Sequence, residues 1–478
     1  MSPSALVRRQ PRKTVLGLLA LSSFVLALPT AEAASDAERV GELEQRLLVL
    51  ERKLEIQQEE AAAKAKEAPS VTAGDKGFSI KNAKGDAEIR FNAVGQVDGR
   101  YFLDDDGAFR DGFVTRRLRP TIQGSVGKLV GFRFTPEFAG STGTGDSASI
   151  VDAYFDLRFD KAASLRVGKQ KGPIGLERLQ SGGAISFIER SFPTELAPNR
   201  DLGVALFGEL ANSTVSYTLG IYNGTADGRD VSTADDGLKE VAGRLFFEPF
   251  KNDYSAFKGL GFGIAGSTGA KDGGGNNNLP RYRTSGQNQF FAYDGGAAAT
   301  ATAPATPAVI ADGRHSRYSP QGYFYYNNLG LLAEYIVSDQ KLARGGLSQN
   351  LKNDAYQFTV SYVLTGEDAS YRGVKPSAPY AIGAEGWGAL ELVARASSLS
   401  IDDDAFLGTT TGATASRLAN PNSNARQADS YGIGLNWYLN SNAKLTADYN
   451  ETRFEGGAAA GADRADEKAL FTRLTIQY

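Results

Sequence analysis

Apolar and polar side chains alternate along most of the chain from residue 78 onward. In the segment 86–102, Ile89, Phe91 and Tyr101 share one parity, and Arg90 and Arg100 share the other. A strand directs successive side chains to opposite faces of its sheet, so this period of two predicts strands with one apolar and one polar face. Aromatic residues are frequent on the apolar faces, which is typical of a membrane barrel rather than a soluble sandwich.

These segments predict an all-β transmembrane barrel of about 16 antiparallel strands, an even number in the range of porins that enclose an aqueous channel. Long loops, among them 171–200, 268–317 and 339–353, alternate with short turns. The connection 366–386 is long at the short-turn end, so either it folds inward or the strand count fails there. The predicted strands are 86–102, 113–126, 129–138, 149–159, 164–170, 201–210, 214–223, 238–249, 259–267, 318–327, 330–338, 354–365, 387–397, 429–439, 444–453 and 467–478.

The first 33 residues have the composition of a secretory signal peptide. Basic residues between positions 8 and 13 precede an apolar run over 15–28, and 31–33 reads Ala-Glu-Ala, a cleavage site. The apolar run is too short to span a bilayer core about 30 Å thick. The chain has no cysteine, which excludes disulfide bonds and thiolate chemistry. We expect an exported protein whose barrel, 78–478, contacts the lipid of the bacterial outer membrane.

Residues 35–67 predict a helix with a heptad seam. Apolar side chains recur at alternating spacings of three and four residues, at Val40, Leu43, Leu47, Leu50 and Leu54. Such a seam is typical of a coiled coil, so we expect a short coiled coil in the periplasm that pairs with copies of itself, as in a homotrimer. A single amphipathic helix on the protein surface is the alternative. Residues 68–77 are expected to form a linker.

Charge is distributed unevenly along the chain. The formal net charge is −3, which alone indicates no affinity for anions. Residues 110–200 nevertheless hold 14 lysines and arginines against 9 aspartates and glutamates. A solvated surface patch would account for this excess unless the strand pattern turns the charges inward.

Strand parity directs a set of arginines into the predicted lumen. A guanidinium is always charged and presents a planar fork of donors to phosphate oxygens. Alternatively, each arginine is neutralised by a lumen carboxylate such as Asp98, Asp152 or Asp156. The arginines with inward parity are Arg90, Arg100, Arg117, Arg119, Arg133, Arg158 and Arg166.

Several short motifs resemble those of the phosphate-selective porin O/P family of outer-membrane channels. They are GKQKGPIGLE at 168–177, ERSFP at 189–193, YTLGIYNG at 217–224, SYVLTGE at 361–367 and NWYLN at 436–440. The resemblance covers roughly residues 78–478 and rests on the succession of the motifs. It implies a channel in which arginines lead anions to a constriction formed by an inward loop, here the third external loop, 171–200.

The resemblance also implies roles for single residues of that loop. Arg178 stands where the family places a loop lysine, and Ser181 where it places a binding serine. A second family serine and lysine fall on Gly182 and Gly183, and this departure weakens the implied phosphate selectivity.

Lys169, Lys171 and Arg190 complete the candidate pore residues. Lys169 and Lys171 share the parity of the apolar positions before them, so they reach the lumen only if the strand ends or bulges first. Arg190 belongs to the ERSFP motif.

The sequence therefore predicts a porin for the passive diffusion of small anions, with inorganic phosphate or polyphosphate favoured. The alternatives are a general or sugar-passing porin, which aromatic residues along the lumen would favour, and a structural protein that links the outer membrane to the cell wall. An enzyme is not expected, because His315, the only histidine, falls in the predicted loop 268–317 without fixed neighbours. No cofactor, metal or nucleic-acid partner is expected.

Overall fold

The structure of the chain, a computed structural model, describes residues 36–74, 77–103, 109–139, 148–231, 237–273, 278–383, 385–409 and 415–478. The predicted signal peptide, 1–33, lies outside these residues. The chain divides into an N-terminal unit that ends at Lys66 and a second unit that begins at Glu67.

The N-terminal unit is formed by α1 (Asp36–Glu67), which confirms the helix predicted over 35–67. Asp36 and Glu38 lie in its first turn, where negative charge stabilises the unpaired N–H groups of a helix. Leu43, Leu47 and Leu50 are all exposed, so the described residues leave the heptad seam uncovered. None of the described helices combines the length and apolarity that crossing a membrane requires.

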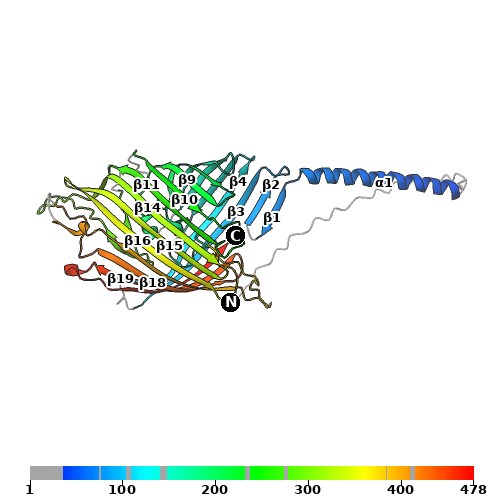
Figure 1. The fold of residues 1–478 in the computed structure, drawn as a ribbon. Coiled ribbons are helices and arrows are strands. Elements are labelled where there is room, and N and C mark those ends of the chain that lie inside the picture. Colours follow the sequence, from blue (N-terminus) through cyan, green and yellow to red (C-terminus); the bar gives the residue numbers. More distant parts are fainter. Residues whose placement is uncertain are drawn as a thin grey trace, which may run out of the picture. The chain divides into compact units, whose positions relative to one another are not determined.

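The second unit is a closed antiparallel barrel of 16 strands, and each of the predicted strands is confirmed (Figure 1). The first and last barrel strands close it, with Val97 opposite Leu474. The barrel strands are β3 (Glu88–Leu103), β4 (Gly112–Val126), β5 (Val130–Glu137), β6 (Ser149–Arg158), β7 (Ser164–Gln170), β8 (Asp201–Leu210), β9 (Val215–Tyr222), β10 (Glu240–Phe247), β11 (Leu260–Lys271), β14 (Ile310–Tyr326), β15 (Leu329–Arg344), β16 (Leu347–Val363), β17 (Ala389–Ser400), β18 (Ala425–Tyr438), β19 (Ala443–Gly456) and β20 (Glu467–Gln477).

The wall has the apolar outer face and the polar inner face that the alternation predicted. On β3, Ile89, Phe91 and Val97 are exposed on the outside, whereas Asp98 and Arg100 are buried within the barrel. Because a closed sheet pairs the backbone groups of every strand, such a wall can contact hydrocarbon without unpaired polar groups.

A hairpin replaces most of the linker predicted over 68–77. β1 (Ser70–Gly74) pairs with β2 (Gly77–Lys81), and Phe78 of β2 lies opposite Phe91 of β3. The pairing of β3 with β20 begins only at Val94, so the first residues of β3 would otherwise form an open edge. The hairpin covers that edge, which satisfies its backbone groups.

Two of the predicted long loops are partly strand: barrel strands extend into one, and the other contains a separate hairpin. β15 and β16 extend through most of 339–353 and meet at a turn formed by Gly345 and Gly346, whose positive φ angles of 54° and 92° favour glycine. Within 268–317, β12 (Arg281–Arg283) and β13 (Gln289–Ala292) form a separate hairpin. The remaining short elements are α2 (Leu176–Leu179), α3 (Pro193–Leu196), η1 (Asp403–Phe406) and η2 (Ala459–Gly461).

The main apolar cluster is built by loops packed against the strands. Ile174 and Leu196 of the loop 171–200 pack there with Tyr282 and Phe291 of the β12–β13 hairpin and with Ile336 of β15. All five side chains are almost completely buried. This packing fixes both loops to the wall and stabilises them by the burial of apolar area.

His315 corrects the expectation of a histidine in a surface loop. β14 begins before it, so His315 lies on a barrel strand, opposite Gly269 of β11. Its ring is fully buried and contacts Ser338 Oγ at 2.9 Å. The same network contains Asp227, which accepts a hydrogen bond from Arg317 at 2.6 Å. The strand start was missed because the loop before it is rich in alanine and proline, which hides the alternation.

Candidate functional site

The loop 171–200 lies inside the barrel and is fixed through its backbone groups. Glu334 of β15 accepts hydrogen bonds from the N–H groups of Leu176 and Glu177 at the start of α2, at 2.5 and 3.2 Å. Glu177 in turn accepts from the N–H group and the hydroxyl of Ser191, at 2.8 and 2.6 Å. A helix leaves its first N–H groups unpaired, so Glu334 holds the loop by satisfying those of α2, and Glu177 fixes the segment just before α3.

Two cations satisfy the carbonyl groups at the other end of α2. Lys171 Nζ donates to the carbonyl oxygens of residues 178–180, at 2.8, 3.0 and 3.0 Å. Arg190 donates to the carbonyl oxygens of Glu177 and Gln180, at 3.0 and 2.8 Å. Carbonyl dipoles orient these cations without neutralising them. Among the described residues, no carboxylate lies within ion-pair distance of Lys171 or Arg190.

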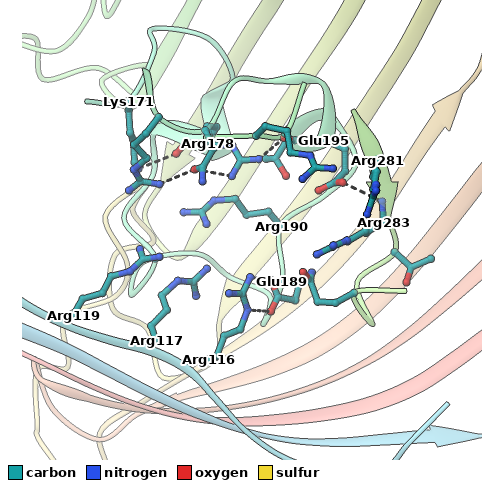
Figure 2. A pocket seen from close by; sticks show the side chains of 18 residues that line it. Arg116, Arg117, Arg119, Lys171, Arg178, Glu189, Arg190, Glu195, Arg281 and Arg283 are labelled. Carbon is teal, nitrogen blue, oxygen red and sulfur yellow. Dashed lines mark hydrogen bonds and ion pairs between the residues drawn. The ribbon is translucent and has the colours of Figure 1, made fainter. Parts of the chain in front are cut away.

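A cavity of about 220 Å³ opens beside this loop. Nine arginines and one lysine line it, against two glutamates, Glu189 and Glu195. Figure 2 shows Arg190 extending into the middle of the cavity, with Arg117 and Arg119 approaching from the wall. Such a concentration of one sign of charge attracts anions. The cationic residues are Arg116, Arg117, Arg119, Lys171, Arg178, Arg190, Arg200, Arg229, Arg281 and Arg283.

Arg116 and Arg117 both face the lumen because β4 contains a β-bulge. Gln96 pairs with Arg117 and Val97 pairs with Thr115, so Arg116 has no partner opposite it on β3. A bulge places two residues of one strand against one of the other and shifts the alternation beyond it. This explains why Arg116 departs from the alternation of the rest of its strand.

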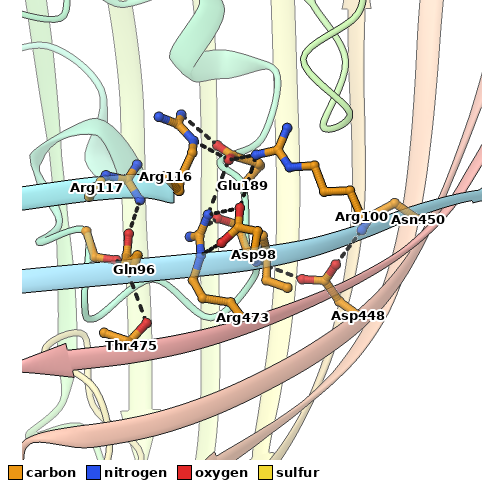
Figure 3. Close-up of polar contacts among 12 residues, drawn as sticks. Gln96, Asp98, Arg100, Arg116, Arg117, Glu189, Asp448, Asn450, Arg473 and Thr475 are labelled. Atoms are coloured by element: carbon orange, nitrogen blue, oxygen red, sulfur yellow. Dashed lines mark hydrogen bonds and ion pairs between the residues drawn. The ribbon is translucent and has the colours of Figure 1, made fainter. Parts of the chain in front are cut away.

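Glu189 neutralises several arginines on one side of the loop (Figure 3). Its carboxylate accepts hydrogen bonds from Arg116 at 2.6 and 3.1 Å and pairs with Arg100 and Arg473 at 3.0 and 3.3 Å. Asp98 also pairs with Arg473, at 2.6 Å. Burial raises the pKa of Glu189, but Arg116 and Arg473 outweigh it and hold that pKa well below its usual range. These arginines are therefore compensated, as the alternative interpretation of the sequence expected.

Arg117 keeps its charge uncompensated. Its Nη1 donates to the amide oxygen of Gln96, whose own amide nitrogen donates to Gly182 O at 3.0 Å and Thr475 Oγ1 at 3.2 Å (Figure 3). No carboxylate of the described residues lies within ion-pair distance of Arg117. Arg117, Lys171 and Arg190 thus present to one cavity three cationic groups whose hydrogen bonds go to uncharged oxygens.

A second cavity, of about 520 Å³, adjoins the first. Arg117, Arg119, Lys171 and Arg200 line both cavities. The two cavities therefore share a cationic wall.

The second cavity also contains Arg133, Arg166, Ser181 and Arg244. Arg166 forms an ion pair with Asp156 at 2.7 Å, and the Arg133 guanidinium lies 3.6 Å from a carboxylate oxygen on the neighbouring strand. These two arginines lie in the lumen as predicted, and both have carboxylate neighbours.

A third cavity, of about 1080 Å³, continues from the second to the short-turn end. Leu179, Ser181 and Arg244 line both. The segment 366–386 borders this cavity, because Tyr371 donates its hydroxyl to Leu176 O at 2.5 Å and its carbonyl accepts from Gln180 at 2.7 Å. Of the two explanations for this long connection, the first is therefore confirmed: the segment folds inward.

Lys169 lines none of these three cavities. It pairs with Leu202 across β7 and β8, and Leu202 is exposed on the outer wall, so Lys169 shares the outward face. β7 ends at Gln170, one residue before Lys171, which is why Lys171 turns into the lumen.

Arg178 lines the first cavity, and Ser181 lines the second and the third. Arg178 donates to Asn199 Oδ1 at 3.2 Å and to Thr194 O. A Cβ atom on Gly183 would lie 1.7 Å from the Gln477 side chain, and one on Gly182 would lie 3.3 Å from Arg117. This chain thus fills with its own side chains the space that further loop side chains would need.

Five cationic residues of the first cavity were not predicted, among them Arg200 at the end of the loop 171–200. Arg116 depends on a bulge, which the alternation cannot reveal. Arg229, Arg281 and Arg283 lie on long loops whose positions no local pattern specifies. Arg244 of the second cavity was predictable, because Val241 and Leu245 on the apolar face of the same strand place it inward.

A closed barrel of 16 strands with an inward loop and a charged lumen defines a porin of the outer membrane. The model of a family described as phosphate-selective porin O and P matches residues 90–478, and the chain belongs to this family.

Individual proteins are also similar to this chain, one in sequence and two in structure. Porin O of Pseudomonas aeruginosa is 23% identical over 419 residues, which cover 84% of this chain and 91% of that protein. The outer membrane channel DcaP of Acinetobacter baumannii is similar in structure, with a TM-score of 0.50, 12% identity and coverage of 84% of this chain and 99% of that chain. An anion-selective porin from Comamonas acidovorans gives a TM-score of 0.49 at 12% identity, over 82% of this chain and 100% of that chain.

Proposed function

We propose that the protein is a passive channel for small anions, with phosphate or polyphosphate as the favoured ion. The observation that carries the proposal is the pairing of Lys171 and Arg190 with carbonyl groups and of Arg117 with an amide. No carboxylate of the described residues forms an ion pair with any of these three cations, and all three line the first cavity. Anions are the ions that such a cavity binds.

The mechanism is electrostatic. A pair of unit charges 4 Å apart interacts by about 4 kcal/mol at an effective dielectric constant near 20, before desolvation is counted. An anion exchanges part of its hydration shell for guanidinium and ammonium donors and passes along the shared lining of the three cavities. Several weak sites in series suit conduction, since an ion must leave each site as readily as it enters. The concentration gradient alone supplies the direction.

The family description supports phosphate as the preferred anion, and the name of Porin O agrees with a channel function. Guanidinium groups also suit phosphate, because their planar fork of donors matches two phosphate oxygens. The two glycines at 182 and 183 remove side chains that the family resemblance implied, so this channel relies on arginines of the wall and Lys171 instead.

We further propose a homotrimer with α1 as a coiled coil in the periplasm. The exposed heptad seam of α1 supports this arrangement, because a seam of this kind gains stability only when it is buried against other helices. Three helices from three protomers would bury it.

Reversal potentials across a planar bilayer in a KCl gradient test the channel proposal. The wild-type protein is expected to be anion-selective, with chloride current that inorganic phosphate blocks. Arg117→Gln removes an uncompensated charge and should weaken the phosphate block by about tenfold, the usual scale for one hydrogen bond to a charged group.

Arg453→Gln is the matched control. Arg453 lies on β19, is exposed, pairs with Glu451 and lines none of the described cavities, so its loss should change neither selectivity nor block. Cation selectivity of the wild-type channel, or an Arg117→Gln channel that behaves as wild type, would refute the proposal.

A sugar-passing porin is the second candidate, because aromatic rings line the third cavity. Tyr323 stacks on Tyr371 at 5.2 Å between ring centroids and contacts Phe246 and Tyr325 at 5.3 and 5.4 Å. Liposome swelling separates the candidates: rapid swelling in a neutral disaccharide together with no phosphate block would favour sugars.

A further inference from the structure

Residues 368–375 of the inward segment line two cavities of unequal volume at the short-turn mouth of the barrel. On one side lies the third cavity of the anion path. On the other lies a separate cavity of about 330 Å³, between this segment, the turn from β18 to β19 and the end of β20. Arg372 of the segment lines both spaces.

We propose that this second space, the side cavity, is a binding site for a small oxyanion that is distinct from the conduction path. Arg372, Lys375 and Lys444 line it, and no carboxylate does. Its volume lies at the lower end of the roughly 300–1,000 Å³ that small-molecule sites occupy. The shared chemistry of its ligands is an oxygen-bearing anionic group, either a phosphate or a carboxylate.

Lys444 provides the strongest argument for a ligand. Its side chain is buried, and Nζ donates to Ile185 O at 2.9 Å and lies 5.2 Å from the centroid of the Tyr438 ring. No carboxylate of the described chain lies within ion-pair distance of Nζ. A buried charge without an ion-pair partner is costly even when a carbonyl oxygen accepts its hydrogen bond, so an anion in the side cavity would stabilise it.

The cavity also combines polar groups with an apolar wall, as small-molecule binding sites do. Arg372 and Lys375 approach from the inward segment, and Asn440 and Ser441 from the opposite turn. Val374 and the Tyr438 ring form an apolar wall. A carboxylate with a small apolar body and inorganic phosphate would both find cationic donors here, and only the first would use the apolar wall.

Protection of an engineered thiol measures occupancy directly, because the natural chain has no cysteine. Ser441→Cys places a thiol in the lining of the side cavity without changing its charge. The rate of modification by an anionic methanethiosulfonate reagent is followed on the full-length protein in detergent, with increasing inorganic phosphate or, in a second series, benzoate. Both anions are expected to slow the reaction, and tighter protection by benzoate would show that the apolar wall contributes.

The double variant Arg372→Gln/Lys375→Gln in the Ser441→Cys background removes two of the three cations. The phosphate concentration for half protection should rise by at least about tenfold. Lys84→Gln/Lys128→Gln is the matched control, since both lysines are exposed at the short-turn end and line none of the four described cavities. It should leave protection unchanged.

Equal protection in the two double variants would overturn the proposal, as would modification rates that neither anion alters in the Ser441→Cys protein. The result is independent of ion selectivity, because the thiol reports binding and not current. A protein that conducts anions but shows no protection refutes the side cavity alone, and a protein that shows protection but passes cations refutes the proposed function alone.

Discussion

Glu189 of the inward loop accepts two hydrogen bonds from Arg116, the extra residue of the β-bulge in β4. The same carboxylate holds Arg100 and Arg473. The bulge of the wall and the carboxylate of the loop thus neutralise one another on one side of the first cavity. Arg117, one residue further along β4, has no carboxylate of the described residues within ion-pair distance.

Glu189→Gln should make the channel more anion-selective and less stable. The change removes one of the two negative charges of the first cavity but leaves buried arginines without their partner, which costs about 3–5 kcal/mol for a broken buried pair. The reversal potential reports the first effect and the thermal unfolding midpoint reports the second. Glu195→Gln is the control, because Glu195 lines the same cavity and, among the described residues, its carboxylate accepts only the Arg283 N–H, so its stability loss should be much smaller. An equal loss in both variants contradicts this account.

Anion selectivity should fall with rising pH through Lys171. Burial first, and then Arg200 and Arg190, hold the pKa of Lys171 well below its usual range. The ammonium therefore loses its proton as pH rises through that lowered pKa, well before an unperturbed lysine titrates near about 10.4. Reversal potentials measured at increasing pH check this, and Lys171→Arg should abolish the change because a guanidinium keeps its charge. If Lys171→Arg follows the same pH curve as wild type, another group is responsible.

Tyr371→Phe should loosen the contact between the inward segment and α2. The hydroxyl that donates to Leu176 O is lost, with an expected cost of about 1 kcal/mol. We expect larger fluctuations of the single-channel current at an unchanged reversal potential, because charge is not altered. Tyr254→Phe, at a fully exposed tyrosine, should leave the current noise as it is. Noise of the wild-type level in Tyr371→Phe would show that the segment is held by its other contacts.

Leu47→Asn in α1 should lower the oligomeric state of the protein without changing the conductance per pore. Leu47 belongs to the heptad seam, whereas Leu48, equally exposed, does not. Light scattering after size-exclusion chromatography distinguishes trimers from monomers, and Leu48→Asn serves as the control. If both variants stay trimeric, the barrel wall and not α1 holds the protomers together.

The barrel was predictable because its cause is local. A barrel strand places apolar side chains outward and polar side chains inward. Ile89 and Arg90 are one example of this alternation, which recurs in the other strands and is readable from neighbouring residues. The inward position of Arg117, Arg133 and Arg166 follows from the same alternation. Lys171 was predicted as a conditional case, and the end of β7 at Gln170 met the condition.

The inward loop and the first cavity were only partly predictable, because the residues that contact one another there are far apart in the sequence. Glu334 meets α2 from a strand more than a hundred residues away, and Arg281 enters the first cavity from a hairpin inside a predicted loop. A single inserted residue at Arg116 reverses the facing of its neighbours. Nothing in the alternation near these positions indicates which partner they find.

The pairing of β3 with β20 has a consequence for biogenesis. A folding intermediate that lacks either strand has two open strand edges. The unpaired backbone N–H and C=O groups of such edges can pair with strands of other chains. The backbone groups of β3 and β20 are therefore paired along this junction only after both ends of the barrel sequence have been inserted.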